Sequence, residues 1–242
     1  MRRGSGIGRR YTSLPGHFKA SERISWWRGR GRGRGGPGAG APVGLPEIAP
    51  GWQDQGTPTR EAALALLHEH TRTEGLRRHA LAVEAVMREV ARRRGEDEEL
   101  WGITGLLHDF DYEAHPDDHP RWGRPVLEAH GYPEPVVRAI QGHATHGDVP
   151  RDTDLARWLF ACDELTGFVV AVALVQPNRE VDRVTAASVR RKLRDRSFAR
   201  SVSREDIALG TAELGVELEG LVPVIVTALS GSTRDLGLNR TA

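Results

Sequence analysis

Apolar residues recur at helical spacing over most of this chain, and this periodicity constrains the fold more than any other feature. From about Thr59 to Leu229 they return every three or four positions, as on one face of an α-helix. No run of alternating apolar and polar residues, the pattern of a half-buried strand, is found. We therefore predict an all-α fold with a single domain over residues 55–231.

Capping and breaking residues divide this region into separate helices. Thr57 or Thr59 can cap the first helix, Gly95 ends the second, and Ser203 with Asp206 fits a capping box. The predicted helices cover residues 61–72, 76–94, 96–109, a segment through Val126 and Leu127, and residues 134–145, 154–175, 185–196, 203–214 and 218–229. The helix over 154–175 is the most apolar, so we expect it at the centre of the fold.

Residues 1–54 have a different composition, rich in Gly, Arg and Pro, with RGRGRGRGG over residues 28–36. Residues 1–50 hold ten basic residues against two acidic ones, a charge of +8, so a total of +1 leaves about −7 for the other 192 residues. We predict a disordered basic arm and a short tail over residues 232–242. The arm is either a solvated tail, an RNA-binding segment, or upstream sequence included by a start codon placed too early.

The sequence also predicts a location. Cys162 is the only cysteine, so no disulfide can form within the chain. No stretch approaches 18 consecutive apolar residues, and no apolar segment follows the charged N-terminus. We expect a cytoplasmic protein without a membrane segment, whose oligomeric state the sequence leaves open.

A histidine and a carboxylate, His108 and Asp109, stand side by side at the end of an apolar run. Burying such a pair requires charge compensation, which a divalent cation can supply to both groups. The alternative is a helix-end Asp hydrogen-bonded to its neighbouring His. Asp163 adds to the pattern, because an acidic residue inside an apolar helix is rarely left unpaired.

Six such residues follow one another in a fixed order, and nearly every one belongs to a different helix or helix end. They are His79, His108, Asp109, His119, His143 and Asp163. This order resembles the HD superfamily of metal-dependent phosphohydrolases. The stretches RHALAVEAVM, EDEELWGITGLLHDFDYE, HGYPEPVVRAI, ACDELTGFVVAVALV and SFARSVSREDI look like the small stand-alone predicted HD hydrolases of bacteria. The resemblance runs from about Ala62 to Leu229 and implies a single HD-type helical bundle.

The resemblance implies that His79, His108, Asp109 and Asp163 hold a primary metal, with Asp109 able to bridge to a second. His108 and Asp109 would be the catalytic pair. His119 and His143 match the additional histidines of the binuclear branch, although His115 and His146 lie nearby and could replace them. A mixed set of nitrogen and oxygen ligands suits Mn, Fe, Co, Ni or Zn, as one or two ions. His17, His68, His70 and His130 match nothing and are expected at the surface.

The implied activity is hydrolysis of a small-molecule phosphate ester, with a nucleotide as the expected case, by metal-activated water. Arg190, Arg191 and Lys192 are candidates for neutralising substrate phosphate, or else a solvated basic helix face. No lysine follows His108-Asp109 closely, and Gly131-Tyr132-Pro133 reads as a helix break rather than the signature of the cyclic-di-GMP branch. Two other functions stay open: a metal- or nucleotide-binding sensor without turnover, and an RNA-associated protein that binds nucleic acid through residues 1–50.

Overall fold

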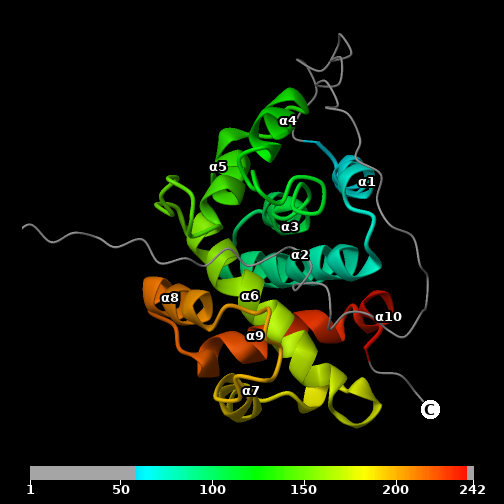
Figure 1. The fold of residues 1–242 in the computed structure, drawn as a ribbon, viewed down its shortest axis with the longest axis vertical. Helices are drawn as coiled ribbons and strands as arrows, with labels where there is room; N and C mark the ends of the chain where they lie inside the picture. Colours follow the sequence, from blue (N-terminus) through cyan, green and yellow to red (C-terminus); the bar gives the residue numbers. More distant parts are fainter. Residues whose placement is uncertain (1–57, 239–242) are drawn as a thin grey trace, which may run out of the picture.

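The structure is a computed structural model that describes residues 58–238, and over these residues all the regular secondary structure is helical (Figure 1). The helices are α1 (Arg60–His70), α2 (Glu74–Arg94), α3 (Glu98–Leu107), α4 (Gly123–Ala129), α5 (Glu134–Gly142), α6 (Asp154–Leu174), α7 (Ala186–Leu193), α8 (Arg204–Leu214), α9 (Leu218–Ser230) and α10 (Thr233–Leu236). Two short 3-10 turns, Pro177–Arg179 and Val181–Arg183, connect α6 to α7. The predicted all-α fold is confirmed. The predicted arm lies outside the described residues.

Side-chain caps explain where several helices begin. The hydroxyl of Thr59 accepts a hydrogen bond from the backbone N–H of Ala62, and the carboxylate of Asp97 accepts from Glu99 and Leu100. Gly95 ends α2 with a φ of 73°, a left-handed conformation that glycine adopts without strain. Ser203 caps α8 through the N–H of Asp206, and no return bond from Asp206 appears among the described contacts, so the expected capping box is half formed.

The apolar side chains form two clusters on either side of α2. The larger surrounds α6, which is buried along almost its whole length, and includes residues of α2, α8, α9 and α10. The smaller lies between α1, α3, α4 and α5. In Figure 1, α6 crosses the middle of the molecule and joins its two halves, so the expected central position of this helix is confirmed.

Several helix bounds differ from the sequence prediction by a few residues, and two of these differences concern the site and the domain end. Helix α5 ends at Gly142, three residues earlier than predicted, so His143 is its C-cap. Helix α10 lies beyond the predicted domain end at residue 231, and Leu236 and Leu238 are buried in the larger cluster. A four-residue helix is too short to show the apolar periodicity on which the prediction rested.

A segment of turns over residues 108–122 connects α3 to α4 and carries much of the candidate site. The carboxylate of Glu113 ties it to the start of α2 by accepting hydrogen bonds from the backbone of Arg72 and Thr73. The hydroxyl of Thr71 donates to the carbonyl of Phe110. His70, expected at the surface, is half-buried with its ring edge against Phe110 and Trp122. These contacts hold an irregular segment in one conformation.

Among the described residues, none of the helices combines the length and the apolarity needed to cross a membrane.

Candidate metal centre

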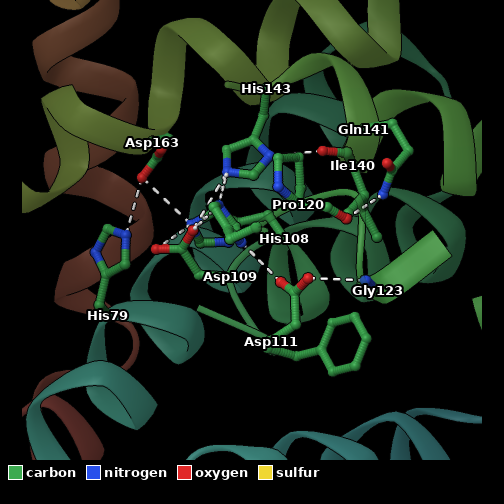
Figure 2. A network of polar contacts seen from close by, with 12 residues as sticks. His79, His108, Asp109, Asp111, Pro120, Gly123, Ile140, Gln141, His143 and Asp163 are labelled. Carbon is green, nitrogen blue, oxygen red and sulfur yellow. Dashed lines mark hydrogen bonds and ion pairs between the residues drawn. The ribbon is translucent and has the colours of Figure 1, made fainter. Parts of the chain in front are cut away.

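The structure brings together the six residues that the sequence singled out, in the space enclosed by α2, α3, α5 and α6 (Figure 2). His79 projects from α2 and Asp163 from the middle of α6. His108 caps the C-terminus of α3, Asp109 follows it, and His143 caps the C-terminus of α5. His119 comes from the segment between α3 and α4. Five of the six side chains are at most 7% exposed, and that of His79 is 13% exposed.

One half of the site is built around Asp163. Its Oδ1 lies 2.9 Å from Nε2 of His79 and 3.3 Å from Nε2 of His108. Nε2 of His108 is also 3.5 Å from Oδ2 of Asp109. His79, His108 and Asp109 offer ligand atoms close enough together to hold one metal ion.

The other half is built around the second oxygen of Asp109. Nε2 of His119 and Nε2 of His143 each lie 3.2 Å from Oδ1 of Asp109. The same two nitrogens are 3.2 Å from each other. Asp109, His119 and His143 form a second group able to hold a metal ion, so Asp109 is shared by both.

Hydrogen bonds at the other ring nitrogen determine which atom of each histidine faces the site. Nδ1 of His108 donates to the carbonyl of Gly105 at 2.8 Å, and Nδ1 of His143 donates to the carbonyl of Ile140 at 2.6 Å. A carbonyl oxygen can only accept, so both Nδ1 atoms carry a proton and the neutral rings present the lone pair of Nε2. Nδ1 of His119 lies 2.7 Å from the carboxylate of Asp111. Such partners are what orient metal-binding histidines in proteins.

Charge compensation is needed at this cluster, as the pKa values show. Burial opposes charge on His108 and His119, but the carboxylates of Asp109, Asp163 and Asp111 outweigh it and raise the pKa of both rings to about 9. Burial likewise opposes charge on Asp109 and Asp163, yet the neighbouring histidines hold the pKa of both carboxyls well below the ordinary range. For His143, burial and neighbouring histidines lower the pKa. Without a metal, protons on His108 and His119 therefore compensate the negative charge of the carboxylates, a role that a bound cation could take over.

The residues fit a divalent transition metal. Within the described part of the chain, Nε2 of His108 is buried without a hydrogen-bond partner, although it faces two carboxylates. An orphaned imidazole nitrogen among carboxylate oxygens is the donor set that such a cation would satisfy. The thiol of Cys162, next to Asp163, has a pKa raised to about 12 by burial, so it stays protonated and is a poor metal ligand.

The alternative histidines are engaged elsewhere. His115 stacks on Trp122 with ring centroids 3.7 Å apart. His146 donates from Nε2 to the backbone carbonyl of His119 at 2.8 Å. His119 and His143, for which His115 and His146 were the alternatives, are the histidines whose Nε2 points to Asp109.

The three basic residues proposed for substrate phosphate lie elsewhere. Arg190, Arg191 and Lys192 are on α7, at the opposite end of the molecule from α3 and α5 (Figure 1). Arg190 is paired with Glu219 of α9 at 2.6 Å, and the ammonium of Lys192 lies over the ring of Phe198. Their expected role in substrate binding stays a prediction from sequence.

Sequence reasoning missed two buried polar residues that support the site. Asp111, fully buried, contacts His119, and Gln141 donates from Nε2 to the carbonyl of Pro120 at 2.6 Å. A signal for Asp111 was present, because a second acidic residue follows His108-Asp109 after one apolar position. A surface cavity of about 380 Å³ lies next to the loop after His143, but none of the six candidate ligands lines it, so it does not mark the site.

The family model of the HD domain matches residues 76–167, a range that contains all six candidate ligands. Residues 76–167 are therefore similar to the HD domain, which defines a superfamily of metal-dependent hydrolases. No curated protein and no solved structure matches the chain.

Proposed function

We propose that this protein is a binuclear metal-dependent phosphohydrolase. The observation that carries the proposal is the position of Asp109, whose two oxygens face separate sets of imidazole nitrogens. Oδ2 lies 3.5 Å from Nε2 of His108, and Oδ1 lies 3.2 Å from Nε2 of both His119 and His143. A carboxylate placed in this way is suited to bridge two cations.

In this proposal the ligands divide into two groups that share Asp109. His79, His108 and Asp163 hold the first cation, and His119 and His143 hold the second. The carbonyls of Gly105 and Ile140 keep the rings of His108 and His143 in the tautomer that leaves Nε2 free. When bound, the cations supply Lewis-acid chemistry, which makes water a better nucleophile at neutral pH and withdraws charge from a phosphoryl group.

The chain's own residues supply orientation and a dry environment. The candidate ligands are almost fully buried, and the helices and the turn segment that carry them pack around two apolar clusters, which fixes their relative positions. Low exposure also strengthens electrostatic interactions within the site. The substrate class that we propose is a phosphate ester, with a nucleotide as the first case to test.

A second candidate function is a metal-binding module without turnover. The same low exposure favours it, because five of the six candidate ligands are at most 7% exposed and leave little surface for a substrate to contact.

The experiment that separates the two is metal analysis of protein purified without chelator, combined with a phosphate-release screen over nucleotides. The hydrolase predicts about two transition-metal ions per chain and release of phosphate from at least one nucleotide. Bound metal with no release from any phosphate ester would favour the binding module. Protein that takes up no transition metal would contradict both.

A further inference from the structure

Asp111 is a fully buried carboxylate that belongs to neither group of candidate ligands. Its Oδ1 lies 2.7 Å from Nδ1 of His119. Its Oδ2 accepts a hydrogen bond of 2.8 Å from the backbone N–H of Gly123, at the start of α4 (Figure 2). Each carboxylate oxygen thus faces a nitrogen.

Because both oxygens of the Asp111 carboxylate can only accept hydrogen bonds, the neutral ring of His119 has one possible tautomer. Nδ1 must donate to Asp111, so Nε2 of the neutral ring has a lone pair, and it is this atom that faces Asp109 and His143. Asp111 therefore selects the tautomer of His119 that can bind a cation.

His119 differs from His108 and His143 in the partner of its Nδ1, which is a side chain and not a backbone carbonyl. His108 and His143 lie at helix C-termini, where the carbonyl three residues earlier accepts from Nδ1. His119 lies in the turn segment between α3 and α4, and its ring bonds a side chain instead. Its tautomer thus depends on Asp111.

Gly123 has the geometry that this arrangement requires. A Cβ at this position would lie 2.7 Å from the ring of Phe110 and 3.0 Å from Oδ2 of Asp111. Glycine allows the backbone N–H to approach the carboxylate and hold it in place.

We propose that Asp111 is a positioning residue, whose carboxylate fixes His119 as an Nε2 ligand of the second cation. This inference rests on the proposed binuclear site. It assigns Asp111 no contact with substrate and no contact with a cation.

The test is Asp111→Asn, which preserves volume but replaces one acceptor oxygen with an NH₂ donor. If the NH₂ group faces His119, Nδ1 must accept and Nε2 carries the proton, which blocks ligation. If it faces Gly123 instead, two donors oppose each other. We expect titration with Co²⁺ to show one ion bound as in the wild type and the other bound about 10- to 100-fold more weakly.

Glu113→Gln is the matched control. Glu113 lies two residues further along the same segment and accepts backbone hydrogen bonds from Arg72 and Thr73, without a described contact to any candidate ligand. It should bind two Co²⁺ ions as the wild type does, even if its melting temperature falls. Wild-type affinity for both ions in folded Asp111→Asn would overturn the inference.

A second measurement covers the case in which Asp111→Asn does not fold. The ¹⁵N NMR signals of the His119 ring can be assigned as those that are absent from the spectrum of His119→Gln. In the Zn²⁺-loaded wild type, these signals should show a protonated Nδ1 and a metal-bound Nε2. A metal-bound Nδ1 or a protonated Nε2 would overturn the role of Asp111. If the wild type binds fewer than two Co²⁺ ions, the binuclear proposal itself is contradicted. The titration of the wild type shows this before any variant is made.

Discussion

Substitution of Asp109 distinguishes its two possible roles, as a metal ligand or as a hydrogen-bond partner of His108 at a helix end. Asp109→Asn keeps the volume and one acceptor oxygen but removes the charge that faces His108, His119 and His143. We expect phosphate release to fall by more than about 100-fold, because even outer-shell partners of metal ligands contribute about 10- to 100-fold. The measurement is turnover per folded molecule together with metal content.

Asp117→Asn is the control for this substitution, because Asp117 is exposed on the same segment. It should retain the metal and full activity. A fully active, metal-replete Asp109→Asn protein would rule out the binuclear hydrolase.

The titration of His108 and His119 gives a prediction about pH. Their pKa is raised to about 9 in the metal-free protein, against about 6.5 in an unfolded chain. The resulting stability is fully present below about pH 6.5 and is lost as the pH rises through about 9. The pKa of His143 is lowered, so its effect on stability changes mainly below and around pH 6.5 and does not offset the loss at higher pH.

A metal ion bound at these histidines would replace the protons, so the loaded protein should escape this loss of stability. We therefore expect the difference in melting temperature between metal-loaded and metal-free protein to widen from pH 6.5 to pH 9. The check is thermal unfolding with and without metal at several values of pH. A difference that stays constant or narrows would contradict proton displacement at these histidines.

At the scale of the helices, Gly105 links the packing of α3 to the site. A Cβ there would lie 2.9 Å from both Cγ of Met87 and the carbonyl oxygen of Val83, so Gly105→Ala would push α3 away from α2. We expect a loss of about 1 to 3 kcal/mol in the free energy of unfolding, the usual cost of overpacking. Metal affinity should fall as well, because the Gly105 carbonyl orients His108.

The comparison for this variant is Gly220→Ala, in the exposed first turn of α9. There the new methyl group would meet only Cγ1 of Val216, a side-chain atom, at 2.9 Å. Denaturant unfolding and Co²⁺ titration of both variants give the result. If Gly105→Ala and Gly220→Ala behaved alike, close packing of α3 on α2 would not position His108.

At the scale of the whole molecule, the candidate ligands connect helices far apart in the chain. His79 and Asp163 are separated by 84 positions, and Asp163 also faces His108. A cation bound to them should stabilise the fold as a unit, by about 2.7 kcal/mol when its free concentration is 100 times the dissociation constant. We expect added metal to raise the melting temperature of the wild type, and to raise that of Asp163→Ala much less.

Asp154→Ala provides the matched variant, because this exposed residue begins the same helix and pairs with Arg94. It should lose a little stability but keep the whole metal-induced shift. An equal shift in Asp163→Ala would remove Asp163 from the ligand set.

Local spacing by itself determined much of this protein. Apolar periodicity predicted the all-α fold and the central α6, and Thr59, Gly95 and Ser203 marked helix ends that the structure confirms. These features depend on residues only a few positions apart, which is the range over which helix periodicity and capping act. The order of the six candidate ligands was also visible, through the resemblance to the HD superfamily.

Tertiary structure decided what depends on residues distant in sequence. It brought His119 and His143, 24 positions apart, to within 3.2 Å of each other, while His115 stacks on Trp122 and His146 bonds the His119 carbonyl. It also placed Asp111 behind His119. The direction in which a side chain outside a helix points is set by packing between elements, and the pattern of apolar residues along the chain carries no information about it.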